Sequence, residues 1–187
     1  MKLVLASNSP RRKELLSEFG FAFEIISSGY QENALNLCPE QTVKEFAYGK
    51  AKEVFDRVND GKTVVLGADT VVSLDGVILG KPKDKAHAED MLKTLSGRAH
   101  QVWTGYCIMH PEGLELNAIK TDVVFNDLSN EIIKSYVESG KPLDKAGAYG
   151  IQDEYNLVKE YLGSYNNVVG LPIEIFAEKL NEILQKN

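Results

Sequence analysis

The segment from Ser7 to Arg12 combines two hydroxyl side chains with two adjacent arginines, directly after an apolar run. Ser9 followed by Pro10 is typical of the first residues of a helix. Free N–H groups and the dipole at a helix N-terminus favour anions, and guanidinium groups bind phosphate through forked hydrogen bonds. Arg11 and Arg12 are unfavourable at this end of a helix unless an anion lies there, so the segment favours a bound polyphosphate. The alternative is an ordinary helix cap with solvated arginines.

A second segment, Gly67 to Thr70, places a carboxylate inside a valine-rich run. Burying an unpaired ionised carboxylate is costly, so we expect Asp69 to face a cleft, where it can bind a metal or take a proton from water. Gly67 permits a close approach or a local kink of the strand. In a continuous strand Asp69 and Thr70 face opposite sides, so we expect both to reach one ligand only if the strand bends. The alternative is an edge-strand aspartate.

Lysine and glutamate side chains supply the remaining candidates. Pro82 holds Lys81 extended after a predicted hairpin, at the same end of the sheet as Asp69 if that hairpin is tight. A positioned ammonium group neutralises phosphate charge. Glu32 could complete a metal site, because Mg²⁺ prefers carboxylate oxygens, and Lys50 is a further candidate. From the residues alone, all three side chains could equally be solvated surface charges.

Several kinds of catalytic site are not favoured by the sequence. The three histidines show no metal-binding spacing such as HExxH, which argues against zinc (His87, His100 and His110). The chain has no Walker A motif, no GxGxxG after a strand and no GxSxG motif. These absences argue against a P-loop NTPase, a Rossmann nucleotide site and a covalent nucleophile. The residues alone therefore point to metal-assisted phosphoryl chemistry.

Hydrophobic periodicity predicts the elements that must position these residues. Strands are predicted over residues 2–6, 21–27, 63–74, 77–79, about 99–110 and about 114–125. Helices are predicted from residue 10 to about 19, and over about 40–58, 83–95, 129–138 and about 172–184. Asp75-Gly76 is a two-residue hairpin turn, and the Gly-rich stretch 144–152 is predicted to be irregular. The alternation of strands and helices with hairpins predicts an α/β fold with a mixed twisted sheet.

The bulk composition limits the function classes further. The 187 residues fit a single domain over residues 1–187, and the net charge of −6 argues against nucleic acid as a partner. Cys38 and Cys107 are far apart in the sequence, so we expect reduced thiols. The first residues lack a signal-peptide pattern, and no apolar stretch reaches the roughly 20 residues that span a bilayer. We therefore expect a cytoplasmic protein without a membrane partner.

Six ordered blocks of sequence resemble the Maf family of nucleotide pyrophosphatases, and the resemblance runs nearly end to end. The blocks are LASNSPRRKELL, LGADTVV, GKP, LSGRAHQVWTG, LDKAGAYGIQ and NNVVGLP. The resemblance implies a fold similar to that of inosine triphosphate pyrophosphatases, with two lobes around a cleft. It also implies cleavage of a nucleoside triphosphate between its α- and β-phosphates, a divalent cation such as Mg²⁺ or Mn²⁺, and a homodimer.

The same resemblance assigns roles to individual residues. Asp69 matches the general base of the family, and with Glu32 it is the expected metal ligand. Glu32 and Lys50 fall where the family has a catalytic glutamate and lysine, and Lys81 matches the lysine of the GKP block, so all three are expected to be catalytic. The expected phosphate-binding residues are those of the first segment, Ser7, Ser9, Arg11 and Arg12.

The block DKAGAYGIQ resembles the subgroup that acts on dTTP and UTP. In that subgroup Arg12, Thr70 and Gln152 match positions tied to the choice of base. A glutamine amide offers a donor and an acceptor, which suits the O4 and N3–H edge of uracil or thymine. The chain departs from the family at Asp153, where glycine is usual, and at Tyr30-Gln31, where an acidic residue often precedes Glu32.

Two rival functions stay open at this stage. The first is a regulatory binding protein in cell division and septum formation, acting through a partner; nucleotide binding without turnover would favour it. The second is a nucleotidase that releases orthophosphate, which differs from a pyrophosphatase mainly in its product.

Overall fold

The computed structural model of the chain describes residues 1–33 and 36–186. Within these residues seven strands form one mixed sheet in the order β2-β1-β3-β5-β6-β7, with β4 paired to β3. β1, β2 and β3 are mutually parallel, and the other pairings are antiparallel. The strands are β1 (Lys2–Leu5), β2 (Phe23–Ile25), β3 (Thr63–Leu74), β4 (Val77–Leu79), β5 (Ala99–His110), β6 (Gly113–Phe125) and β7 (Val158–Leu162).

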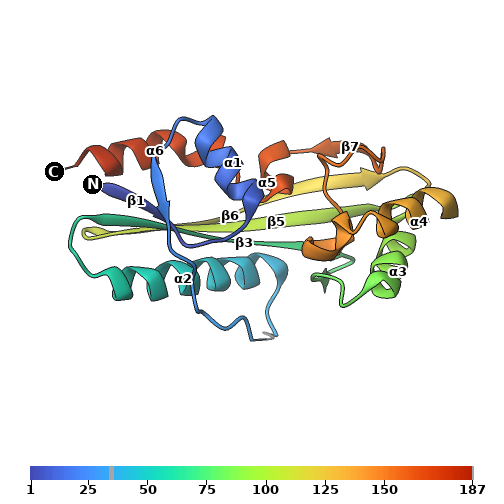
Figure 1. Cartoon of the computed structure of the whole chain (residues 1–187), viewed down its shortest axis with the longest axis horizontal. Helices are drawn as coiled ribbons and strands as arrows, with labels where there is room; N and C mark the ends of the chain where they lie inside the picture. Colours follow the sequence, from blue (N-terminus) through green and yellow to red (C-terminus); the bar gives the residue numbers. More distant parts are fainter. Residues whose placement is uncertain (34–35, 187) are drawn as a thin grey trace.

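Helices cover both faces of this sheet (Figure 1). One face carries α2, and the other carries α1 and α6, while α3 and α4 pack together at the far end of the long strands. The α-helices are α1 (Pro10–Glu18), α2 (Pro39–Val58), α3 (Lys85–Leu95), α4 (Asn130–Glu138), α5 (Tyr165–Val169) and α6 (Ile173–Gln185). Two short 3₁₀ helices follow α4, namely η1 (Lys141–Asp144) and η2 (Ala146–Ala148). None of the described helices is both long and apolar enough to cross a membrane.

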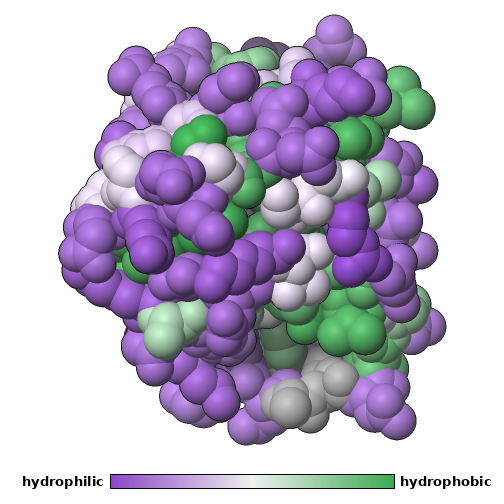
Figure 2. Space-filling view, turned by 90° about the vertical axis from the view of Figure 1, so that its right-hand side faces the viewer, coloured by the Kyte–Doolittle hydropathy of each residue, from purple (hydrophilic) through white to green (hydrophobic). Residues whose placement is uncertain are grey.

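The core is divided between two lobes. One lobe packs α1, α2 and α6 against β1 and the first half of β3, and the other packs α3 and α4 against the end of β3. Alternate residues of β1 point to opposite faces, so Leu3 and Leu5 pack with α1 and α6 while Val4 packs with α2. A separate apolar cluster joins Val72 of β3 to α3 and α4. The surface at the α3–α4 end is covered mainly by hydrophilic side chains, with apolar ones in smaller groups between them (Figure 2). The long strands β3, β5 and β6 connect the two lobes.

Two glycines let α2 lie directly on the sheet. A Cβ at Gly67 of β3 would lie 2.4 Å from the Ala47 carbonyl oxygen, and one at Gly105 of β5 would lie 2.3 Å from that of Val43. Side chains at these positions would force the helix away, because backbone atoms cannot move aside as a side chain can. The close approach expected at Gly67 is therefore confirmed, and it sets the height of α2 above β3.

A gap in the sheet lies in the middle of β3. β1 pairs with β3 only as far as Leu66, and β4 pairs with it only from Val72. Residues 67–71 thus have no strand on that edge within the part of the chain that the structure describes. The chain leaves β1 through the segment from Ser7, and leaves β4 through Gly80, so both exits border the gap.

The α/β fold class and most elements agree with the sequence prediction. β3, β4 and β5 have the predicted bounds, and Asp75 and Gly76 adopt the positive φ angles of 51° and 82° that their hairpin turn needs. β2 is shorter than predicted, and α3 begins two residues late because the Asp84 side chain caps it by accepting from His87 N–H. β7 and α5 were not predicted at all.

Candidate active site

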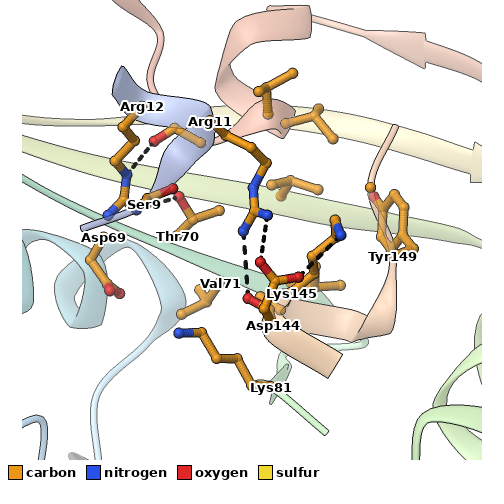
Figure 3. A pocket seen from close by; sticks show the side chains of 18 of the residues that line it. Ser9, Arg11, Arg12, Asp69, Thr70, Val71, Lys81, Asp144, Lys145 and Tyr149 are labelled. Atoms are coloured by element: carbon orange, nitrogen blue, oxygen red, sulfur yellow. Dashed lines mark hydrogen bonds and ion pairs between the residues drawn. The ribbon is translucent and has the colours of Figure 1, made fainter. Parts of the chain in front are cut away.

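A cavity of about 510 Å³ opens at the gap in the sheet, between the two lobes. Its walls come from the segment after β1, from α1, α2 and β3, and from the stretch between η1 and Gln152 (Figure 3). Nine of the residues singled out in the sequence line it: Ser9, Arg11, Arg12, Glu32, Lys50, Asp69, Thr70, Lys81 and Gln152. Ser7 does not line the cavity, but its hydroxyl accepts a hydrogen bond from Arg12 Nη1 at 3.2 Å.

Asp69 and Thr70 reach the cavity from opposite faces of a continuous strand. β3 keeps an unbroken register with β5 through both residues. The expectation that both could reach one ligand only if the strand bends is therefore wrong. Asp69 faces α2, where Lys50 lies, and Thr70 faces α1, where Arg12 lies. Both line the same cavity because it opens at the unpaired edge of the strand, around which both faces are accessible.

Lys50 of α2 joins the two candidate acidic residues. Its ammonium group lies 2.7 Å from Asp69 Oδ1 and 2.5 Å from Glu32 Oε1. The side chains of Lys50 and Asp69 are 13% and 10% exposed, whereas that of Glu32 is 47% exposed. The loop before Glu32 is held by Tyr30, whose ring lies against Gly49, where a Cβ would be 2.3 Å from the ring. Tyr30 thus anchors this loop on α2.

The charge state of Asp69 depends on opposing influences. Burial raises the pKa of its carboxyl group, while Lys50 and Arg12 lower it and Glu32 raises it again, so that the net effect is a raised pKa. A carboxylate with a raised pKa is a stronger proton acceptor than an exposed aspartate. This environment suits a general base whose lysine partner keeps it ionised.

Arg12 is held on the opposite wall by three hydrogen bonds. Its Nε donates to the Gly170 carbonyl oxygen at 2.9 Å, and Nη1 and Nη2 donate to the hydroxyls of Ser7 and Thr70. Ser9 occupies the N-cap position of α1, but its side chain makes no capping hydrogen bond. The start of α1 therefore keeps N–H groups available beside a fixed guanidinium group.

Arg11 and Lys145 both form ion pairs with Asp144 at the cavity, and the sequence did not predict this shared partner. Arg11 Nη1 lies 2.8 Å from Asp144 Oδ2, and Lys145 Nζ lies 3.1 Å from the other oxygen of that carboxylate. Asp144 and Lys145 fall in the Gly-rich stretch 144–152, which was predicted to be irregular but holds the end of η1 and the short 3₁₀ helix η2. Their role in the site was not predicted, although their position within a matching block was the available signal. Lys81 lines the cavity from the segment after β4, and its side chain is drawn below Asp144 in Figure 3.

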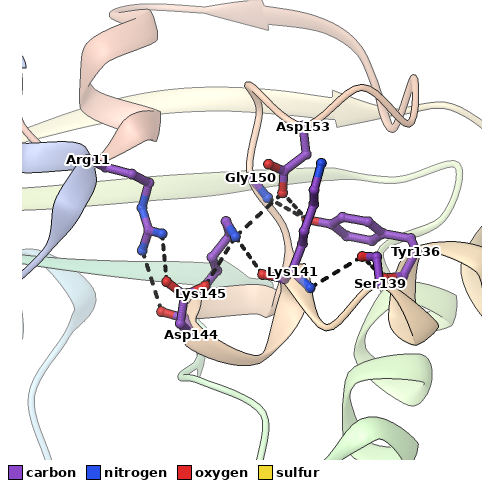
Figure 4. Close-up of polar contacts among 8 residues, drawn as sticks. All are labelled: Arg11, Tyr136, Ser139, Lys141, Asp144, Lys145, Gly150 and Asp153. Carbon is purple, nitrogen blue, oxygen red and sulfur yellow. Dashed lines mark hydrogen bonds and ion pairs between the residues drawn. The ribbon is translucent and has the colours of Figure 1, made fainter. Parts of the chain in front are cut away.

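The loop that carries Gln152 is tied to α4 by its neighbour Asp153 (Figure 4). Asp153 Oδ2 accepts a hydrogen bond from the Tyr136 hydroxyl at 2.5 Å and lies 3.5 Å from Lys145 Nζ. The same Tyr136 hydroxyl accepts from Gly150 N–H at 3.0 Å. Asp153 is therefore an anchor of this loop, while Gln152 itself stays exposed at the cavity.

The acidic pair is suited to hold a divalent metal together with a substrate. Asp69 and Glu32 flank the Lys50 ammonium, and each pairs with it through one of its two carboxylate oxygens. No cluster of three or more potential His, Cys, Asp or Glu ligands exists in residues 1–33 and 36–186, so the protein would supply two carboxylates at this position. Mg²⁺ commonly binds through one or two carboxylates, with substrate phosphates and water completing the octahedron. The donor set fits Mg²⁺ or Mn²⁺ on those terms.

Comparison with known proteins identifies one family, and its members match this chain over nearly its whole length. The family described as Maf-like protein matches residues 2–183. A curated dTTP/UTP pyrophosphatase of Thermococcus kodakarensis is 50% identical over 182 residues, which cover 97% of this chain and 96% of that protein. A protein of the same name from Bacillus pumilus is 48% identical, with 92% and 91% covered.

A solved structure, that of the Staphylococcus aureus Ham1 protein, resembles the fold. It has a TM-score of 0.50 and 15% sequence identity, and the match covers 68% of this chain and 73% of that chain. At this level of identity the likeness concerns the fold alone, and it confirms the predicted fold class.

Proposed function

This chain belongs to the Maf family, and on that premise we propose that it hydrolyses nucleoside triphosphates, preferentially dTTP and UTP, to the monophosphate and pyrophosphate. The observation that carries the proposal is the buried Asp69, ion-paired to Lys50 in a cavity whose other walls carry arginine and lysine side chains. The names of relatives about 50% identical over almost their full length support the choice of dTTP and UTP. The Gln152 and Thr70 side chains at the cavity are the proposed contacts to the base, and Arg12 is proposed to affect the choice of base through its hydrogen bond to Thr70.

The proposed chemical step is attack of water on the α-phosphorus. Asp69 accepts one proton from that water and orients it, the new bond forms between the water oxygen and the α-phosphorus, and the bond from the α-phosphorus to the bridging oxygen breaks. The electron pair leaves with pyrophosphate. Because Lys50 holds Asp69 at 2.7 Å, the base is positioned before the substrate arrives.

The cationic side chains stabilise the charge that develops on the departing pyrophosphate. Arg12 is already fixed by its three hydrogen bonds, whereas Arg11 must exchange Asp144 for phosphate oxygens. Lys81 approaches the cavity from β4 and supplies a further positive charge. Asp69 and Glu32 would hold the divalent cation, which when bound neutralises phosphate charge and polarises the α-phosphoryl group.

We propose in addition that the enzyme acts in the cytoplasm as a homodimer, as the family resemblance implies. Analytical ultracentrifugation would test the dimer directly. A single species with the mass of one chain at micromolar concentration would contradict that part of the proposal.

The reaction is tested by incubating the purified protein with Mg²⁺ or Mn²⁺ and a panel of nucleoside triphosphates in ¹⁸O-labelled water. We expect UMP and pyrophosphate from UTP, with the heavy oxygen in UMP because the α-phosphorus is attacked. Release of orthophosphate would identify the nucleotidase alternative. Nucleotide binding without turnover across the panel would favour the regulatory binding protein instead.

A further inference from the structure

The hydroxyl of Thr70 lies in the middle of a chain of hydrogen bonds that begins at Arg12. Arg12 Nη2 lies 3.1 Å from Thr70 Oγ1, which lies 2.9 Å from Thr104 Oγ1. Thr104 Oγ1 in turn lies 2.8 Å from the main-chain carbonyl oxygen of Asn167 in α5. Thr104 and Asn167 are fully buried, so water cannot substitute for either partner.

The two ends of this chain fix the direction of every proton in it. A guanidinium group only donates, and a carbonyl oxygen only accepts. Thr104 has one hydroxyl proton, and the buried Asn167 carbonyl requires it. Thr70 must therefore donate its own proton to Thr104 Oγ1, while it accepts from Arg12.

With its proton committed to Thr104, Thr70 can offer the cavity only its remaining lone pair. Phosphate oxygens at neutral pH are acceptors, so they gain nothing from this lone pair. A ligand group that meets it favourably must carry an N–H or O–H donor. In UTP and dTTP the N3–H group of the base is such a donor, and Gln152 then contacts O4 through its amide N–H. Cytosine presents an unprotonated N3 at the same position.

We propose that Thr104 is a specificity-positioning residue, which makes Thr70 an obligate acceptor and thereby selects the N3–H edge of uracil or thymine against cytosine. The inference rests on the proposed function, since it concerns the choice among its substrates. Thr104 on β5 and Thr70 on β3 are paired directly across the two strands, so the buried hydroxyl lies next to the one at the cavity. Thr104 does not touch the substrate and acts through Thr70.

The test replaces Thr104 with valine, which keeps the shape of the side chain but removes the acceptor for the Thr70 proton. Thr70 can then turn its proton to the cavity and donate to N3 of cytosine. We expect the ratio of kcat/KM for UTP to that for CTP to fall by about tenfold, which corresponds to roughly one hydrogen bond. Thr104→Ser keeps the hydroxyl and should retain the wild-type ratio.

Thr121→Val is the matched control for lost stability. Thr121 is also fully buried, lies on the neighbouring strand β6 and supports the same α5 region through Ser164 and Asn167. Its substitution should lower the melting temperature as Thr104→Val does. It should leave the ratio of UTP to CTP unchanged, because it does not contact Thr70.

The outcomes separate this inference from the proposed function. If the wild type turns over no nucleotide, the proposed function fails. If it prefers UTP and Thr104→Val keeps that preference unchanged, the inference about Thr104 is wrong while the function stands. If Thr104→Val alters only the discrimination between UTP and 3′-deoxy-UTP, Thr70 meets the sugar hydroxyl and the assignment to the base is overturned.

Discussion

Asp69 is a buried carboxylate whose neighbours act on its charge in opposite directions. Burial raises the pKa of Asp69 and the nearby Lys50 and Arg12 lower it, with a net upward shift. The balance places the carboxyl group nearer to the pH at which a general base is most effective. Of the neighbouring cations, Lys50 has the stronger influence, because it forms a direct ion pair at 2.7 Å.

Replacing Lys50 with methionine should therefore change the pH dependence of turnover. Loss of the positive charge raises the pKa of Asp69 further, so a larger fraction of the carboxyl group is protonated at a given pH. We expect lower kcat, and an acidic limb of the pH–rate profile that moves to higher pH. Lys52→Met on the exposed side of the same helix is the control and should leave the limb in place. If the acidic limb of the pH–rate profile stays at the same pH in the Lys50 variant, ionisation of Asp69 does not control that limb.

Individual residues were predictable from the sequence to different degrees. The first segment and Asp69 were identified from local chemistry, because a helix start with arginines and a carboxylate among valines are unusual without a ligand. Glu32 and Lys50 could be selected only through the family resemblance, since their ion pair joins a loop to a helix. The involvement of Asp144 was missed because its place in a matching block, the one available signal, does not indicate that it faces Arg11.

At the scale of elements, the distance between α2 and β3 is set by residues without side chains. Gly67→Ala would place a Cβ against the backbone of α2, at 2.4 Å from the Ala47 carbonyl oxygen. We expect the free energy of unfolding to fall by about 1–3 kcal/mol, as for other overpacked cores. Activity should fall as well, because displacement of α2 moves Lys50 away from Asp69.

Gly29→Ala provides the control for this prediction. Its Cβ would lie 4.0 Å from a Glu53 carboxylate oxygen, which is ordinary contact. Chemical denaturation and UTP turnover of both variants would be compared. A Gly67 variant as stable and as active as the Gly29 variant would contradict the account of how α2 is positioned.

The loop that carries Gln152 should depend on Asp153. Asp153→Asn removes the charge that faces Lys145 and weakens the bond from the Tyr136 hydroxyl. We expect a few-fold increase in KM for UTP with little change in kcat, equivalent to about 1 kcal/mol of binding, because Gln152 is less firmly positioned. Steady-state kinetics would measure this, with Glu154→Gln as the control at the next, exposed position. Equal KM values in the two variants would argue against an anchoring role.

Most elements were predictable because their patterns are local. The valine-rich β3 and its Asp75-Gly76 turn are fixed by propensity and turn chemistry. β7 and α5 were missed because each has only five residues, and because β7 lies at the edge of the sheet with mostly exposed side chains. The hydrogen bonds that stabilise α5, such as those of Asn167 to β5 and β6, come from distant parts of the chain.

At the scale of the whole molecule, the cavity lies where it does because β1 and β4 pair with different parts of β3. The gap at residues 67–71 exists because β1 ends and β4 begins at different heights along β3, which no local pattern in the sequence reveals. The gap explains how Asp69 and Thr70 share one cavity without a bend in the strand. It also gathers several cations in a protein whose net charge is −6, so that a polyanion is attracted to one place on an otherwise acidic molecule.

The most direct test of the account measures pyrophosphate release from UTP by Asp69→Asn and by the wild type under identical metal concentrations. Asparagine keeps the shape of the side chain but cannot accept the proton of the attacking water. We expect turnover to fall by a factor on the order of 10² or more while the variant still folds and binds UTP. Turnover at the wild-type rate would remove Asp69 from the role of general base and contradict the proposed mechanism.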